Sequence, residues 1–216
     1  MQSAVRAKLW DLLAALPIAS WFGLVAYSAL LELARATDWA QAPFERATQF
    51  ANAGFALIMI ALFALRPAAI AQPRDWRAIA ICLLGALAPM TIVLLPRGAA
   101  SPALLTFSNG LVLAATLASI VIVLWLGRAF SILPQARMLV TSGPYRVVRH
   151  PLYLAEFVAL FGLALQFALP WSLLLWIFAV AAQFPRMHFE EGALRRGFPA
   201  YDDYAARTAR LLPGLY

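Results

Sequence analysis

Charged residues are scarce in this chain, and cysteine and histidine are scarcer. Only 12% of the 216 residues are Asp, Glu, Lys or Arg, with one cysteine and two histidines. The single cysteine, Cys82, excludes an intrachain disulfide and a metal site built from several cysteine ligands. So few charges also exclude an ordinary soluble domain, in which about a quarter of the residues are charged.

Several short catalytic motifs are missing as well. The chain contains no Gly-x-Gly-x-x-Gly, no Walker loop, no His-Glu-x-x-His and no Gly-x-Ser-x-Gly. Their absence argues against a Rossmann nucleotide site, a P-loop, a zincin-type metal centre and a nucleophile elbow. We therefore expect no bound metal, and any nucleotide-like cofactor must be held by helices.

Long apolar runs are what the chain has in abundance. Hydrophobic residues make up 63% of it, and about 20 apolar residues of helix cross a membrane core of about 30 Å. The runs predict an all-α integral membrane protein, a polytopic helical bundle with one membrane domain over residues 1–216. The six predicted spans are approximately 10–31, 47–65, 78–96, 103–127, 151–169 and 171–185. The last two form a C-terminal hairpin with a tight turn at Pro170-Trp171.

The basic residues indicate how the bundle is oriented. The net charge is +7, but the 17 Lys and Arg are spread between apolar runs rather than gathered for nucleic acid. All but Arg35, Arg46 and Arg97 fall in alternate segments, which the positive-inside rule assigns to the cytoplasm together with both termini. Arg6 and Lys8 also fit a secretory signal, but the apolar run continues through Leu31 and favours an uncleaved helix.

A first charged cluster precedes the fifth apolar run. Arg146, Arg149 and His150 stand directly before Pro151, a residue that suits the first position of a helix. The unpaired amides of a helix N-terminus and a neighbouring arginine favour a carboxylate or phosphate. Tyr153 in the first turn would cover such a site. The alternative is that the arginines only contact lipid headgroups.

A second cluster follows the sixth run. Arg186 and Glu190 are four residues apart, so they share a helical face, while Glu191 projects about 100° away. The pair alone fits a structural salt bridge. Two adjacent carboxylates also suit a cation in a low-dielectric pocket. Both clusters are expected on one membrane face.

Acidic and amphipathic features complete the C-terminal half. Residues 190–212 alternate aromatic and charged side chains, which predicts a cytosolic amphipathic tail that folds back beneath the membrane or lies on lipid. Glu156 would be costly facing lipid and should point into the bundle. It is either a site residue or a partner of Arg149.

The ordered set of motifs resembles a known family. Gly143-Pro144-Tyr145-Arg146, Arg149-His150-Pro151-Leu152-Tyr153, the hairpin, Arg186 with Glu190-Glu191, and then Tyr201, Tyr204 and Leu212-Pro213 are similar to the isoprenylcysteine carboxyl methyltransferase family. Phospholipid N-methyltransferases are related to that family. The resemblance covers roughly residues 128–213, but residues 195–200 depart from the usual pattern, which leaves the tail geometry open.

This resemblance implies a methyltransferase that uses S-adenosylmethionine and a lipophilic acceptor from the bilayer. Residues 128–216 would form the cofactor-binding core, and residues 1–127 would shape the substrate channel. Arg186 would orient the acceptor and, with Glu190, serve catalysis. The implied cofactor residues are Arg137, Met138, Leu139, Val140, Tyr145, His150, Pro151, Leu152, Tyr153, Glu190 and Glu191.

The acceptor and the reaction class have alternatives. A carboxylate acceptor is favoured because it is already ionised at neutral pH and needs no base. An amine acceptor, as in phospholipid N-methyltransferases, would need a proton acceptor such as His188 or Glu156. Membrane sterol reductases carry a similar Arg-His-Pro-x-Tyr stretch and use NADPH. A non-catalytic multi-span protein is the third alternative.

Overall fold

The computed structural model describes residues 2–37, 42–71 and 75–214, and the side chains of residues 2–12, 14 and 15 are outside that description. The predicted cytoplasmic charges of Arg6, Lys8 and Arg74 therefore lie outside the described side chains. In the described ranges every regular element is helical, as predicted. They are α1 (Gln2–Arg35), α2 (Pro43–Leu65), α3 (Trp76–Leu87), η1 (Ala88–Leu94), α4 (Pro102–Leu126), η2 (Gly127–Ala129), η3 (Gly143–Arg146), α5 (Pro151–Ala164), α6 (Trp171–Gly197) and α7 (Tyr201–Arg207).

Four helical segments are long and apolar enough to cross a membrane. They are Leu16–Arg35, Pro43–Leu65, Trp76–Leu94 and Pro102–Ala129. These segments match the first four predicted spans and make the chain an integral membrane protein. Helix α5 has only 14 residues, so the total of six spans stays a prediction, as does the side of the membrane that each end faces.

The structure corrects two predicted boundaries. The fifth run is helical only to Ala164, and residues 165–170 connect α5 to α6. Pro185 does not end the sixth helix, because α6 continues through it to Gly197. A proline removes one backbone hydrogen bond, and the buried residues on both sides of Pro185 hold the helix together. In the third span the helix changes into the 3-10 helix η1 at Ala88, next to Pro89, whose nitrogen carries no hydrogen to donate.

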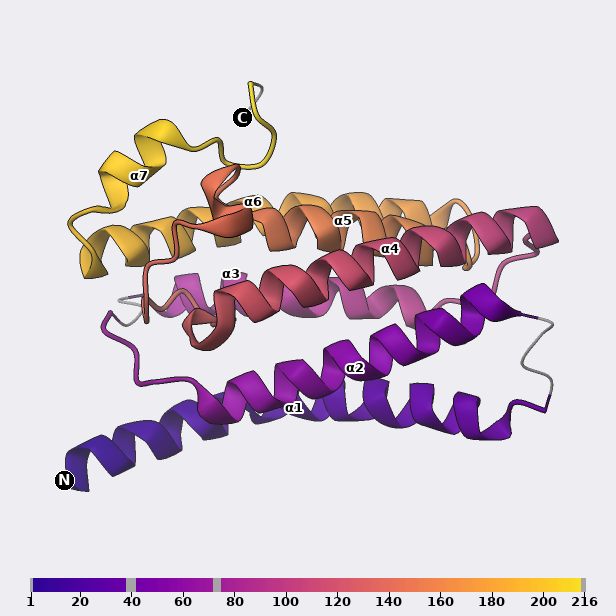
Figure 1. Ribbon diagram of the computed structural model, residues 1–216, viewed down its shortest axis with the longest axis horizontal. Helices are drawn as coiled ribbons and strands as arrows, with labels where there is room; N and C mark the ends of the chain where they lie inside the picture. The colour runs from indigo at the N-terminus through magenta and orange to yellow at the C-terminus, as the bar shows by residue number, and fades with distance from the viewer. Residues whose placement is uncertain (1, 38–41, 72–74, 215–216) are drawn as a thin grey trace.

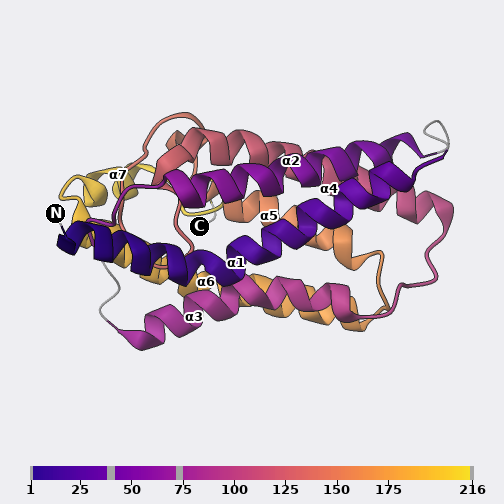
Figure 2. The ribbon, with the colours of Figure 1, turned by 90° about the horizontal axis from the view of Figure 1, so that it is seen from below.

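The helices lie side by side along one axis, with η3 and α7 at one end (Figure 1). Neighbours in the bundle are α1 and α2, α2 and α4, α4 and α5, and α3 and α6. Figure 2 shows α3 and α6 on the opposite side of α1 from α2 and α4. No comparable packing joins α1 to α3 within the described ranges, and this leaves room for a groove between them.

Close packing of α4 on α5 fixes the position of the first cluster. A Cβ at Gly162 would lie 2.9 Å from Val112 Cγ2 and 3.0 Å from the Ser108 carbonyl oxygen. The Ser108 hydroxyl donates a hydrogen bond of 2.9 Å to the Gly162 carbonyl. The absence of a side chain at Gly162 lets the two helices approach, and α5 therefore begins at a defined point beside the end of α4.

Candidate active site

The loop between α4 and α5 carries the first cluster and turns sharply at Gly143. This glycine has φ +59°, and a Cβ there would lie 2.2 Å from the Trp125 ring. Only glycine fits such a turn, because other residues rarely adopt positive φ and the ring leaves no space. The turn brings Tyr145, which is buried, to the end of the bundle where α5 begins.

The C-terminal tail is bonded to this loop. The Arg149 and His150 amides donate to the carbonyl oxygens of Ala209 and Arg210, at 2.8 and 3.1 Å. The Tyr204 hydroxyl donates a 2.7 Å bond to the Tyr145 carbonyl. Burial raises the pKa of Tyr204 to about 12, so this hydroxyl stays protonated and remains a donor at neutral pH. The predicted amphipathic tail thus packs on the 143–150 segment.

Glu191 is the centre of an ion cluster that joins the tail to the loop. Its Oε1 lies 3.1 Å from Arg149 Nη1, 3.1 Å from His150 Nε2 and 2.9 Å from Arg210 Nε. Burial alone would raise the pKa of this carboxyl, but the hydrogen bonds from His150 and Arg210 and the charge of Arg149 outweigh it and lower the pKa to about 2. Glu191 is therefore ionised and fully engaged with side chains of the protein.

Glu190, the neighbouring carboxylate, faces a different group of residues. Its Oε1 lies 3.1 Å from Arg186 Nε and also accepts a hydrogen bond from the Tyr153 hydroxyl. The Arg186 guanidinium stacks over the Tyr153 ring at 5.1 Å, and its Nη1 lies 3.4 Å from Gln183 Oε1. Arginine has five N–H donors, so these contacts leave donors free for a ligand.

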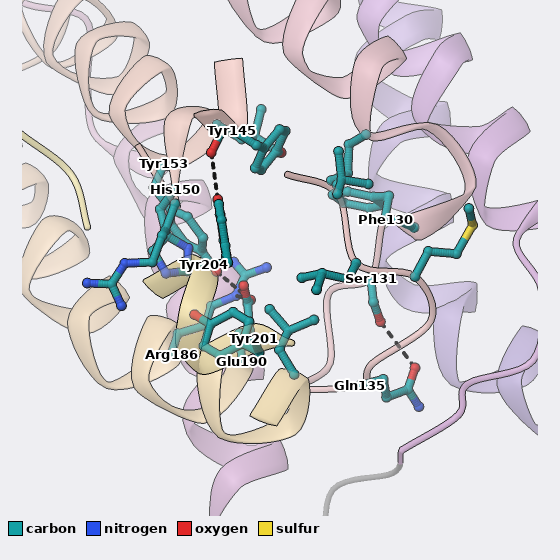
Figure 3. A pocket seen from close by; sticks show the side chains of 18 of the residues that line it. Phe130, Ser131, Gln135, Tyr145, His150, Tyr153, Arg186, Glu190, Tyr201 and Tyr204 are labelled. Atoms are coloured by element: carbon teal, nitrogen blue, oxygen red, sulfur yellow. Dashed lines mark hydrogen bonds and ion pairs between the residues drawn. The ribbon is translucent and has the colours of Figure 1, made fainter. Parts of the chain in front are cut away.

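A cavity lies between the joined clusters and the 130–135 loop, with Arg186, Glu190 and Tyr153 on one side and the loop opposite (Figure 3). We call it the motif cavity. Among the described residues, two buried polar atoms of the lining, Arg149 Nε and Tyr201 Oη, have no hydrogen bond of good geometry, although the two side chains lie close to each other. Its volume is about 110 Å³. The lining comprises Leu126, Ala129, Phe130, Ser131, Leu133, Gln135, Met138, Leu139, Val140, Tyr145, Arg149, His150, Leu152, Tyr153, Glu156, Arg186, Glu190, Leu194, Tyr201 and Tyr204.

A second, mostly apolar cavity meets the motif cavity. We call it the apolar groove; its volume is about 370 Å³. Side chains of α1 such as Trp21 line one wall, and Met90 of η1 lines the other. Phe130, Glu156 and Arg186 line both cavities and mark the junction between them. The lining is otherwise supplied mainly by the N-terminal helices, where the substrate channel was expected.

The structure brings most of the predicted cofactor residues to the motif cavity, but not all. Arg137, Pro151 and Glu191 are not in its lining, although Glu191 lies directly behind Arg149 and His150. Arg137 is buried and donates hydrogen bonds to Pro67 and Gln135. His188 is exposed and outside both cavities. The predicted residues in the lining are Met138, Leu139, Val140, Tyr145, His150, Leu152, Tyr153, Arg186 and Glu190.

Some lining residues had no signal in the sequence. Phe130, Ser131 and Gln135 lie in an irregular segment without periodicity, so nothing marked them as neighbours of the second cluster. Tyr201 and Tyr204 were recognised as part of an amphipathic tail and a family motif, but not as walls of the cavity. Among the described residues, no group of three or more His, Cys, Asp or Glu side chains could hold a metal ion.

One known protein family matches the part of the chain that carries most of the motif cavity. Residues 97–200 match the Phospholipid methyltransferase family. This stretch contains α4, the loop with residues 143–150, α5 and α6. It also contains Phe130, Glu156 and Arg186, the three residues at the junction of the two cavities. The match confirms the predicted resemblance to membrane methyltransferases for this part of the chain.

Two curated relatives match a shorter stretch. The nickel-cobalt-cadmium resistance protein NccN of Alcaligenes xylosoxydans xylosoxydans is 42% identical over 79 residues, which are 36% of this chain and 37% of NccN. The cobalt-zinc-cadmium resistance protein CzcN of Cupriavidus metallidurans is 38% identical over 79 residues, 36% of each chain. The match thus spans little more than a third of the length of these relatives.

Proposed function

We propose that the protein transfers a methyl group from S-adenosylmethionine to a lipophilic acceptor that enters from the membrane. The observation that carries this proposal is the junction at Phe130, Glu156 and Arg186, where a polar cavity meets an apolar groove. A water-soluble methyl donor and a membrane-borne acceptor need such an arrangement, because each must reach the same point from a different medium. The family match supports the reaction class.

The chemistry of the motif cavity fits this cofactor. S-adenosylmethionine, when bound, supplies a methyl group on a cationic sulfonium and also carries an ammonium and a carboxylate. Glu190 offers the negative charge for the cationic centres, and the guanidinium of Arg149 offers donors for the carboxylate. Arg149 Nε and Tyr201 Oη, which have no hydrogen bond of good geometry among the described residues, would gain partners from a polar ligand.

The size of the cavity implies that the tail moves. Ligand pockets usually measure about 300–1,000 Å³, whereas the motif cavity measures about 110 Å³. Tyr201 and Tyr204 of the tail line it, and α7 has only 7 residues. An outward shift of this short helix would enlarge the cavity, and it would break the contacts of Tyr204 with the Tyr145 carbonyl and of Tyr201 with Arg195. We propose that the tail then closes over the cofactor and excludes water.

Arg186 is the residue best placed to hold the acceptor. Within the described residues it is the one cationic side chain that lines both cavities. Its free donors would bind a carboxylate at the end of the groove, in line with the methyl group. Alignment of two reactants can lower a barrier by about 7–11 kcal/mol in favourable cases. We therefore propose a carboxylate as the acceptor, which loses no proton and gains the methyl group as an ester.

An amine acceptor is the second candidate, and Glu156 is the observation that favours it. This carboxyl group lies at the junction and forms no ion pair or hydrogen bond with the described residues. An amine must lose a proton before or during methylation, and Glu156 is placed to accept it. His188 cannot do so from its exposed position.

Substituting Glu156 with glutamine separates these two candidates. With a carboxylate acceptor we expect kcat to fall less than about tenfold, because no base is required. A general base contributes about 10²–10⁴-fold, so a loss of that size would reject the carboxylate and favour the amine. The measurement is initial-rate kinetics with saturating cofactor, with Asp203→Asn, an exposed carboxylate outside every cavity, as the matched control.

Binding of S-adenosylhomocysteine tests the cofactor assignment. Calorimetry should give a Kd in the micromolar range and a loss of about tenfold to a hundredfold in Glu190→Gln, the size expected for one charge-assisted contact. Asp203→Asn, an exposed carboxylate outside the cavity, should bind like the unaltered protein. Binding of NADPH without S-adenosylhomocysteine would reject the methyltransferase in favour of a reductase.

Label transfer identifies the product. Methyl-tritiated S-adenosylmethionine is incubated with the protein and a total lipid extract, and the labelled lipid is treated with base. We expect base-labile label, as in an ester. Base-stable label would indicate an amine or a thioether, and the absence of any labelled lipid would reject a lipophilic acceptor.

A further inference from the structure

A third cavity lies at the end of the bundle opposite the motif cavity, where α1 ends and α2 and α4 begin. We call it the end cavity; its volume is about 720 Å³. It shares no lining residue with the motif cavity or the apolar groove. The lining comprises Glu32, Arg35, Ala36, Ala42, Pro43, Phe44, Glu45, Arg46, Gln49, Arg97, Pro102, Leu105, Thr106, Asn109 and Gln166.

This lining contains three arginines, Arg35, Arg46 and Arg97. It also contains two acidic residues, Glu32 and Glu45. No ion pair joins these arginines to Glu32 or Glu45 in the described part of the chain. Arg46 Nε is buried and has no hydrogen-bond partner among the residues that the structure describes. Leaving a charged donor buried without an acceptor is costly. The missing acceptor is therefore expected to be an oxyanion inside the cavity.

Arg97, another lining residue of the end cavity, has its side chain fixed by two neighbours. It donates a 2.9 Å hydrogen bond to Gln166 Oε1 and stacks over the Phe167 ring at 4.6 Å. Gln166 in turn donates to Ser108 Oγ at 2.7 Å and to Asn109 Oδ1 at 3.1 Å. Because this series of hydrogen bonds fixes one nitrogen of the guanidinium group, the remaining N–H donors of Arg97 keep a defined direction. Such an arrangement suits the tetrahedral oxygens of a phosphate.

The position of the cavity indicates the source of the phosphate. Helices that span a core of about 30 Å end at the level of the lipid headgroups, and three of the four candidate spans have an end at this cavity. Phe44 and Leu105 line it and are 53% and 39% exposed, so they offer apolar contact for acyl chains. We infer that the end cavity binds the phosphate of a phospholipid headgroup.

Native mass spectrometry of the full chain in detergent tests the inference. The probes are dioleoylphosphatidylglycerol, dioleoylglycerol, which lacks the phosphate, and inorganic phosphate. We expect one tightly bound phosphatidylglycerol and no comparable adduct with dioleoylglycerol. In Arg46→Gln the Kd for the phospholipid should rise about tenfold to a hundredfold, as for the loss of a charge-assisted contact.

A matched variant at the other end controls for nonspecific attraction of charge. Arg196→Gln removes an exposed arginine outside every cavity and should leave the Kd unchanged. Equal weakening in both variants, or equal binding of dioleoylglycerol, would overturn the inference. Binding of inorganic phosphate with no preference for the phospholipid would overturn the lipid assignment. The methyltransferase proposal stands or falls separately, because the two sites share no residue.

Discussion

Replacing Arg186 with alanine should reduce turnover about 10²–10³-fold, the loss seen when one group that stabilises a transition state is removed. The guanidinium lies at the junction of the two cavities and is 7% exposed. Its loss leaves the acceptor without an anchor in line with the methyl group. Single-turnover kinetics with saturating S-adenosylmethionine measures this step directly.

Cofactor affinity should not fall in the same variant. Arg186 Nε lies 3.1 Å from Glu190, so its removal leaves the Glu190 charge fully available to the cationic centres of the cofactor. Calorimetry with S-adenosylhomocysteine should therefore give an unchanged or lower Kd. Arg186→Lys, which keeps the charge but not the fork of donors, should recover part of the turnover. Equal losses of binding and turnover in Arg186→Ala would contradict its assignment to the acceptor.

Replacing Glu191 with glutamine should release the tail from the 143–150 segment. The free energy that holds the tail should fall by about 3–5 kcal/mol, the usual effect of removing one partner from a buried ion pair. Glu191 is 2% exposed and within 3.1 Å of Arg149, His150 and Arg210. Without its charge, the two arginines would repel each other. Hydrogen exchange of the Arg149 and His150 amides, which donate to the tail, reports the release.

Asp202→Asn is the matched control for this variant. Asp202 lies 2.9 Å from Arg195, but the two side chains are 74% and 41% exposed. Surface ion pairs contribute about 0–1 kcal/mol, so exchange of the same two amides should hardly change. A large effect in Asp202→Asn, or a small one in Glu191→Gln, would show that the ion cluster does not hold the tail.

The lowered pKa of Glu191 predicts how docking of the tail on the 143–150 segment depends on pH. The pKa of Glu191 falls from an ordinary 4.5 to about 2 in the folded protein. A lowered pKa means that the stabilisation is fully present above about pH 4.5 and is lost as pH falls toward 2. Amide exchange in the tail should therefore accelerate in this window in the unaltered protein but not in Glu191→Gln.

Much of the fold was decided by the sequence, because helical spans follow from the length of apolar runs. The first four runs became the four candidate spans. Boundaries at proline were less predictable. Pro89 changes the helix type, while Pro185 lies inside a continuous helix. The difference depends on what the flanking residues pack against, and local sequence does not contain that information.

The sequence by itself determined which charged groups meet at the candidate site: the Arg186 and Glu190 pair at helical spacing and the His150-Pro151 helix start, together with the family that residues 97–200 match. Only the tertiary structure decided how the two adjacent carboxylates divide their roles. Successive helical residues point about 100° apart, so Glu190 faces the motif cavity while Glu191 faces the tail. Which partners lie in those two directions depends on contacts between segments far apart in the chain.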